Sequence, residues 1–425
     1  MSQYAAMSPS LRAQEIAGLK TQLSGFEQLG CQLDMSRGKP GREQLDSVSD
    51  ILTVLDSGEQ CCFAGQDARN YGQLAGLPCA REYWADMLGC RPEQTIVGGN
   101  ASLNLMYDVL ARGCLFGLPH SPRPWCQEAE KKFLCPAPGY DRHFRITEQL
   151  GFSLIPIPMT PAGPNMDAVE EAVRDPSVKG IWCVPKYSNP QGYVYSDETC
   201  RRIAALRPAA PDFTVMWDNA YCVHEFEGDF LPFPDILSLC ADAGNADMVY
   251  EFASTSKITL PGAGISALAA SEENIRYHLG LMGVQTISYD KVNQLRHVLY
   301  LKDRAHTLAL MRRHAEILAP KFRLVLEKLD EQLAPYGIAR WNRPKGGYFV
   351  CVEAMPGTAK RALALCAGAG VKLTEAGATY PYGLDPNDSM IRIAPSLPPL
   401  EELEQAMDIF CTCLRIAALE KLGSI

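Results

Sequence analysis

One stretch of the chain, over residues 179–192, reads KGIWCVPKYSNPQG. Its first half is apolar without polar alternation, which is typical of a strand buried on both faces of a parallel sheet. Its second half is a turn that contains Asn189. The same order of strand and polar turn recurs in FTVMWDNAY, at 213–221, and in ADMVYEFASTSK, at 246–257. Helical segments separate these strands, so the sequence predicts an α/β fold with a mostly parallel sheet.

The polar residues of this pattern come where strands end. Ligands of parallel sheets bind at the carboxyl ends of the strands. We therefore expect an amide (Asn189), a carboxylate (Asp218) and the group from Ser254 to Lys257 to lie on one rim. A lysine held there partly out of water loses some preference for its ammonium form. The neutral amine is a nucleophile suited to Schiff-base chemistry.

The length of 425 residues exceeds what one small core needs. Strands and helices alternate from about residue 130 to 270, and a long helix from roughly residue 303 to 333, followed by an α+β pattern, comes later in the chain. We expect a large domain over residues 55–300. A smaller α+β domain would combine residues 1–54, which include an amphipathic helix, with residues 301–425.

Composition limits the kinds of partner and the compartment. A net charge of −9 argues against a nucleic-acid partner, and no apolar stretch is long enough to span a membrane. The N-terminus shows no secretory signal. The 16 cysteines are scattered, which fits reduced thiols in the cytoplasm, and their spacing matches no zinc motif, so no metal site is expected.

Two glycine-containing segments have features of anion sites. The segment DMSRGKPGR, at 34–42, places three cations within six residues, and is either a surface turn or a carboxylate site. The segment TIVGGNAS, at 95–102, predicts a strand, a glycine turn and a helix start, an arrangement that holds phosphates. It matches neither the Walker nor the Rossmann motif.

Four motifs occur together in one order. They are NPQG at 189–192, DNAY at 218–221, S-x-x-K at 254–257 and IRIA at 391–394. Jointly they resemble the class I aminotransferases, which are fold-type I enzymes that use pyridoxal 5′-phosphate (PLP). The segments SRGKP at 36–40, QT at 285–286 and DKVNQLR at 290–296 look like a bacterial subgroup of aspartate aminotransferases related to the catalytic part of MocR-type proteins.

This resemblance implies a seven-stranded type of sheet in a large PLP-binding domain. It makes Lys257 the Schiff-base lysine, which carries the proton between the substrate Cα and the cofactor. Asp218 would face the pyridine nitrogen and keep the ring protonated as an electron sink. Tyr221 and Asn189 would bond the phenolic oxygen of the cofactor, and Tyr140 would stack on its ring.

The resemblance also implies phosphate, substrate and partner contacts. Arg392 would bind the substrate α-carboxylate as a two-pronged fork, helped by the backbone of Gly38. Tyr71 would reach the phosphate of the neighbouring subunit, so the active unit would be a homodimer. Four residues would hold the phosphate within one subunit: Ala101, Ser102, Ser254 and Ser256.

The chain departs from the family pattern in two places. Many class I enzymes have an arginine after the lysine that pairs with the phosphate, whereas here the run at 262–264 is Gly-Ala-Gly. No residue securely matches the arginine that reads the second carboxylate of the substrate. Arg37, Lys39 and Lys291 are the alternatives for that role.

The resemblance to this subgroup implies a cytoplasmic aminotransferase that moves an amino group from L-aspartate to 2-oxoglutarate by a ping-pong mechanism. An aminotransferase of other specificity, or a PLP-dependent lyase or decarboxylase, is the alternative within the cofactor class. A MocR-like ligand-sensing regulator is a remote alternative. Such a regulator carries a further DNA-binding domain, whereas the catalytic-type motifs of this chain begin by Ser36.

Overall fold

The computed structural model describes residues 3–423 of the chain. Its main sheet has eight strands in the order β4-β11-β10-β9-β8-β5-β6-β7. Neighbouring strands from β10 to β6 run parallel, whereas β11 is antiparallel to both of its neighbours. The strands are β4 (Thr95–Val97), β5 (Lys132–Ala137), β6 (Ser153–Thr160), β7 (Gly163–Pro164), β8 (Val178–Cys183), β9 (Thr214–Asp218), β10 (Val249–Ser254) and β11 (Ser266–Ala270). The predicted α/β fold with a mostly parallel sheet is confirmed, and the two-residue β7 adds one strand to the expected seven.

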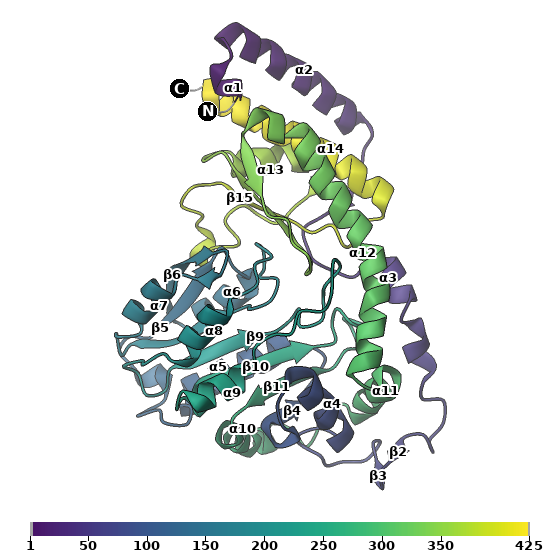
Figure 1. Ribbon diagram of the computed structural model, residues 1–425, viewed down its shortest axis with the longest axis vertical. Helices are drawn as coiled ribbons and strands as arrows, with labels where there is room; N and C mark the ends of the chain where they lie inside the picture. Colours follow the sequence, from purple (N-terminus) through teal and green to yellow (C-terminus); the bar gives the residue numbers. More distant parts are fainter. Residues whose placement is uncertain (1–2, 424–425) are drawn as a thin grey trace.

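Strand β9 shows why these strands lack polar alternation. Val215 and Trp217 belong to one hydrophobic core, and Met216 between them belongs to another. Successive side chains of a strand face opposite sides of the sheet, so a strand covered on both faces is apolar throughout. Figure 1 shows the sheet with helices packed around it. The first core includes α4 (Pro78–Leu88), α7 (Met166–Ala172), α8 (Asp197–Ala204), α9 (Ile236–Asp242) and α11 (Lys291–Leu301), and the second includes α5 (Ser102–Phe116), α6 (Asp141–Gln149) and α10 (Glu272–Gln285).

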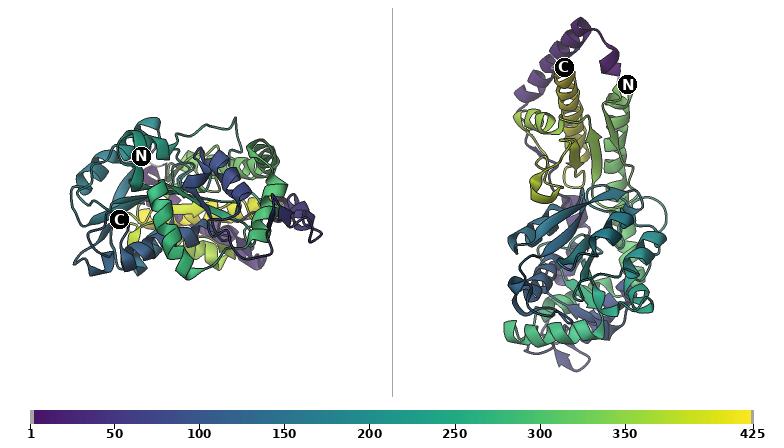
Figure 2. Two further views of the ribbon diagram at one scale, coloured as in Figure 1. Left: turned by 90° about the horizontal axis from the view of Figure 1, so that it is seen from below. Right: turned by 90° about the vertical axis from the view of Figure 1, so that its left-hand side faces the viewer.

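A smaller antiparallel sheet, in the order β12-β13-β15, lies in the upper part of Figure 1. Leu19 and Leu23, from the N-terminal helix, lie in its hydrophobic core. Both chain ends lie at this end of the molecule, where the first and last long helices run side by side (Figures 1 and 2). The elements are α2 (Pro9–Gln28), β12 (Ala339–Trp341), β13 (Val350–Ala354), α13 (Ala359–Gly368), β15 (Met390–Ile393) and α14 (Leu400–Gly423).

The long helix α12 (Arg304–Gln332) joins the two parts of the molecule. Leu310 and Met311, in its first half, pack into a core of the main sheet. Phe322 and Val325, in its second half, pack into the core of the smaller sheet. The domain limits at residues 54/55 and 300/301 stay a prediction, because α12 contributes to both cores.

The strand that leads to Lys257 differs in position from the sequence expectation. Residues 246–248, expected to be extended, form a 3₁₀ turn, and β10 begins at Val249. β10 then continues to Ser254, because it pairs with β9 on one side and β11 on the other. Lys257 therefore follows the strand end by three residues.

The segment around residues 34–42 is held by an unpredicted strand pair. β1 (Leu33–Asp34) runs parallel to β14 (Val371–Lys372), although more than three hundred residues separate them. The short elements α1 (Gln3–Ala6), α3 (Arg42–Asp46), β2 (Cys62–Phe63) and β3 (Gln66–Asp67) complete the described α-helices and strands. All 16 cysteines are free thiols. Within residues 3–423, no helix combines the length and apolar character needed to cross a membrane.

Candidate active site

A cavity of about 360 Å³ opens at the carboxyl ends of β9 and β10, between the main sheet and the smaller one. Its lining brings together thirteen of the fifteen predicted site residues, and Tyr71 and Lys291 lie outside it. The thirteen are Arg37, Gly38, Lys39, Ala101, Ser102, Tyr140, Asn189, Asp218, Tyr221, Ser254, Ser256, Lys257 and Arg392. The rim expected from strand ends therefore exists in the folded chain.

Lys257 is half-buried in this cavity. Its amine lies 5.2 Å from the centre of the Tyr221 ring and 6.0 Å from that of Tyr348. Burial lowers the pKa of the amine, and the carboxylate of Asp218 opposes part of this shift. More of the amine is therefore neutral near pH 7 than for a lysine in water, as nucleophilic chemistry requires.

Asp218, the last residue of β9, has two unequal oxygens. Its Oδ2 lies 3.0 Å from Nε2 of His143, in α6, and both side chains are buried. The imidazole stacks on the Trp182 ring, with ring centres 4.2 Å apart and planes 5° apart. The other oxygen, Oδ1, is buried and has no hydrogen-bond partner among residues 3–423. A buried oxygen without a partner is costly unless a ligand donates to it.

Sequence reasoning did not identify His143. The residue lies three positions after Tyr140, which is one helical turn, and this spacing was the only local signal. Tyr140 itself is the residue before α6, and burial raises the pKa of its hydroxyl to about 12. Burial likewise raises the pKa of Tyr221 well above its usual range. Both phenols therefore stay protonated and can donate hydrogen bonds near pH 7.

A phosphate-type cradle lies at one side of the cavity. β4 leads through a glycine turn to Ser102, the first residue of α5, where a helix start presents backbone N–H groups and positive charge. The hydroxyls of Ser254 and Ser256 are 3.0 Å apart and line the same cavity. These groups together suit an anion without any cation from residues 262–264.

Arg392, in β15, is buried and also lines this cavity. Its guanidinium lies over the ring of Phe349, 4.8 Å from the ring centre. Its Nη1 donates to Oδ1 of Asn189 at 3.0 Å and to Oδ1 of Asp141 at 3.2 Å. Phe349 also explains Gly38, because a Cβ at residue 38 would lie 2.8 Å from the Phe349 ring.

Three exposed cations line the cavity mouth: Arg37, Lys39 and Arg142. None of them forms a salt bridge within the described part of the chain. Sequence reasoning missed Arg142, since nothing in its local pattern distinguishes it from other surface arginines. Proximity of all three to Arg392 in one cavity fits a ligand with two negative groups.

The structure does not bring Lys291 to the cavity. Its buried amine donates to the backbone carbonyl of Gly72 at 2.9 Å and to that of Asn70. This amine is already used, so Lys291 does not read a substrate carboxylate from this position. Tyr71 lies between the two residues whose carbonyls Lys291 binds, and it is 81% exposed.

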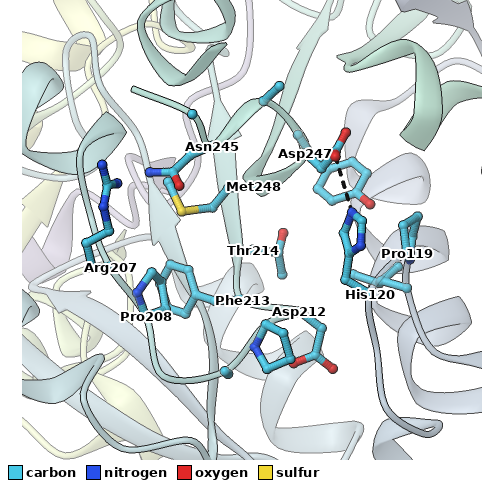
Figure 3. Close-up of a pocket in the computed structure, with 16 residues that line it drawn as sticks. Pro119, His120, Arg207, Pro208, Asp212, Phe213, Thr214, Asn245, Asp247 and Met248 are labelled. Carbon is cyan, nitrogen blue, oxygen red and sulfur yellow. Dashed lines mark hydrogen bonds and ion pairs between the residues drawn. The ribbon is translucent and has the colours of Figure 1, made fainter. Parts of the chain in front are cut away.

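A second cavity, of about 320 Å³, lies at the opposite edge of the main sheet (Figure 3). It adjoins Thr214 and Met248, at the amino ends of β9 and β10. The guanidinium of Arg207, at its edge, donates to three backbone carbonyls and has little capacity left for a ligand. This cavity contains none of the predicted site residues.

The rim of the second cavity includes an ion pair between His120 and Asp247, at 3.2 Å, which Figure 3 marks. With Glu273, these residues form one group of potential metal ligands within 4.8 Å of one another. Two of the three are exposed, and exposed acidic groups gather on many surfaces without a metal. The chemistry of the chain is therefore assigned to the first cavity.

Comparisons with known proteins agree with this site. Residues 7–424 match the family described as aspartate amino-transferase. An aspartate aminotransferase from Corynebacterium glutamicum is 47% identical over 402 residues, which are 95% of this chain and 93% of that protein.

Solved structures give the same result for the fold. An aspartate transaminase crystal structure from Corynebacterium glutamicum superposes with a TM-score of 0.96, at 45% identity and over 99% of both chains. An α-aminoadipate aminotransferase from Thermus thermophilus, complexed with N-(5′-phosphopyridoxyl)-L-leucine, has a TM-score of 0.71 at 20% identity over the whole of both chains, and shows the fold alone. The match to the family over almost the whole chain, together with the lysine and carboxylate of the cavity, shows that this protein is an aminotransferase of the PLP-dependent, fold-type I aspartate aminotransferase family.

Proposed function

We propose that this aminotransferase moves an amino group from L-aspartate to 2-oxoglutarate in two half-reactions of a ping-pong mechanism. The observation that carries the proposal is the unpartnered, buried Oδ1 of Asp218 in the cavity that contains the half-buried amine of Lys257. The name of the 47% identical relative supports aspartate as the amino donor.

The cavity fits PLP. Lys257 would hold the group covalently, and Oδ1 of Asp218 would accept a hydrogen bond from the protonated ring nitrogen, which supplies the partner this oxygen lacks. Ser254, Ser256 and the start of α5 would hold the phosphate. When bound, PLP supplies the electron sink for the reaction and carries the amino group between the half-reactions.

The residues of the chain then have separate tasks. Arg392 binds the α-carboxylate of the amino acid and thereby fixes the direction of its Cα–H bond. Lys257 takes the proton from Cα, because its lowered pKa keeps the amine available as a base. Asp218, held by His143, would place its carboxylate against the ring nitrogen of the bound cofactor. Asn189 and Tyr221 would bond the phenolic oxygen of the cofactor.

The second carboxylate of aspartate would meet the cations at the cavity mouth. Arg37 and Lys39 are the two remaining residues expected from the sequence, and Arg142 joins them. Oxaloacetate would leave the site after the first half-reaction, and 2-oxoglutarate, also a dicarboxylate, would use the same contacts. Glutamate is then the second product.

We also propose a homodimer. Tyr71 is too exposed to serve its own cavity and would reach the phosphate of a second subunit. Lys291 would support this contact, because it anchors the backbone on both sides of Tyr71. Val284 and Ile287 lie at and just beyond the end of α10, are 92% and 61% exposed, and would be covered in the dimer. The free thiols fit the reducing conditions of the cytoplasm.

An absorption spectrum tests the proposal. We expect the purified protein with PLP to show the visible band of a lysine-bound cofactor. Aspartate alone should abolish the band and release one oxaloacetate per site, and 2-oxoglutarate should restore it with release of glutamate. A band that responds to another amino acid but not to aspartate would contradict the specificity. Release of CO₂ would instead favour the decarboxylase alternative.

A further inference from the structure

The guanidinium of Arg392 is fully engaged by groups of the protein itself. Its Nε donates to Oγ1 of Thr374 at 3.2 Å, and its Nη2 donates to the same oxygen at 3.0 Å and to the carbonyl of Ser36 at 3.4 Å. Its Nη1 donates to Asn189 and to Asp141. An arginine has five N–H groups, and these bonds use all five. A substrate carboxylate therefore cannot form a two-pronged bond with Arg392 until a partner leaves.

Asp141 differs from the other partners in charge and position. It is the only carboxylate among them, since the others offer an amide, a hydroxyl and a backbone carbonyl. Its side chain lines the cavity and is 30% exposed, whereas the side chain of Arg392 is 6% exposed. Its charge and its partner are thus those of the carboxylate that Arg392 is expected to bind.

The carboxylate of Asp141 also has a second favourable position, away from Arg392. It is the first residue of α6, where the positive end of the helix stabilises a negative side chain. Turning away from Arg392 would keep the carboxylate near that helix start and in contact with water. Because a substrate carboxylate takes its place, the exchange does not leave the buried guanidinium of Arg392 without a charged partner.

We propose that Asp141 is an internal competitor that occupies the carboxylate position on Arg392 and is displaced when the substrate binds. Asp141 is a positioning and selectivity residue in this scheme, because only ligands with a carboxylate replace the ion pair that Arg392 loses when Asp141 leaves. The inference rests on the proposed function in taking Arg392 as the site of the α-carboxylate. The measured affinity for any carboxylate ligand is reduced by the fraction of protein in which Asp141 holds Arg392.

Binding of maleate to the PLP-loaded protein tests the proposal, because maleate has two carboxylates and no amino group to react. The Asp141→Asn variant keeps the size of the side chain and removes its charge. We expect the Kd for maleate, measured by calorimetry, to fall about fivefold or more, because this value is the upper range for exposed ion pairs and Arg392 is buried. The KM for aspartate should fall by a similar factor, and kcat should change less than KM.

Two further variants separate competition from other effects. Asp141→Glu keeps the charge and should bind maleate like the wild type. Glu148→Gln removes one charge from the same helix and should leave the Kd unchanged. Glu148 pairs with Arg145 at a distance of 3.3 Å and does not line the cavity. An unchanged or raised Kd in Asp141→Asn, or an equal fall in Glu148→Gln, would overturn the proposal.

The calorimetric result is distinguishable from failure of the proposed function. If aspartate does not abolish the visible band, the assigned substrate is wrong. The Kd for maleate would still show whether Asp141 competes for Arg392. A circular dichroism spectrum and a thermal unfolding curve of each variant confirm that the comparison is made on folded protein.

Discussion

At the scale of single residues, Asp218 combines one oxygen fixed by His143 with one that is free for a ligand. Asp218→Asn keeps the shape of the side chain and removes its charge. We expect weaker PLP binding and a slowing of Cα proton removal by orders of magnitude, since the charge no longer keeps the ring nitrogen protonated. Stopped-flow measurement of the aspartate half-reaction checks this, and an unchanged rate would refute the role of the carboxylate.

Lys257 provides a second test at this scale. Lys257→Ala removes the amine that would hold PLP and move the proton. The variant should lack the visible band and retain at most traces of activity. Ser256→Ala, at the residue before Lys257, serves as the comparison, because it should weaken phosphate binding without removing the band. Substantial turnover by Lys257→Ala would show that the catalytic group lies elsewhere.

The cations at the cavity mouth give a test of specificity. Arg37→Gln, Lys39→Gln and Arg142→Gln each remove one of them. Loss of the cation that reads the second carboxylate should raise the KM for aspartate about tenfold or more, as charge-assisted hydrogen bonds are worth roughly 1.5–3 kcal/mol. The KM for alanine, which lacks that carboxylate, should not change.

Arg42 offers a matched control for these variants. It lies in the same segment, pairs with Asp46 at 3.4 Å and is almost fully exposed outside the cavity. Arg42→Gln should leave both KM values as they are. Equal effects on aspartate and alanine in all three mouth variants would show that the second carboxylate is read by another group.

At the scale of elements, β10 contains a buried acid in its centre. Glu251 is 3% exposed, and its Oε1 accepts a hydrogen bond from Nδ2 of Asn219 at 2.9 Å. Burial raises the pKa of its carboxyl from 4.5 to about 8. The unfolded chain loses this proton near pH 4.5, and the folded chain keeps it to about pH 8. The contribution of Glu251 to stability is therefore complete at low pH and is lost as pH rises through this range.

Glu251→Gln tests this linkage, because glutamine keeps an acceptor for Asn219 and cannot ionise. One pKa unit corresponds to about 1.4 kcal/mol, so the change for Glu251 is on the order of a few kcal/mol. The urea midpoint of the wild type should fall between about pH 5 and about pH 8 by more than that of the variant. Equal falls in both proteins would mean that Glu251 ionises in the folded state at its ordinary pKa.

Local patterns predicted most elements, and pairing over long distances determined the exceptions. The glycine turn at 98–101 predicted a strand before it and a helix after it, and β4 and α5 lie at these positions. β1 could not be predicted, since its two residues become a strand only by pairing with β14. The same pairing positions the start of the 36–40 loop. Arg392 then donates a hydrogen bond to the carbonyl of Ser36 in this loop.

At the scale of the whole molecule, a shared active site would depend on two subunits. Lys257→Ala and Tyr71→Ala, each weak alone, would complement each other when unfolded and refolded together. A mixed dimer would contain one site with Lys257 and the Tyr71 of its partner. Random mixing gives roughly a quarter of intact sites. Activity no greater than the sum of the two separate variants would show that Tyr71 acts within its own subunit or not at all.

The sequence by itself determined the strands and the residues at their ends, because burial on both faces and chain turns leave local patterns. Asn189, Asp218 and Lys257 could be placed on one rim for that reason. Only the tertiary structure determined that His143 supports Asp218 from 75 residues away and that Asp141 meets Arg392 from 251 residues away. The structure also shows that Lys291, which the sequence made a candidate for the cavity, binds the loop that contains Tyr71. Such contacts depend on how whole elements pack, and packing between distant segments leaves no periodicity in the chain.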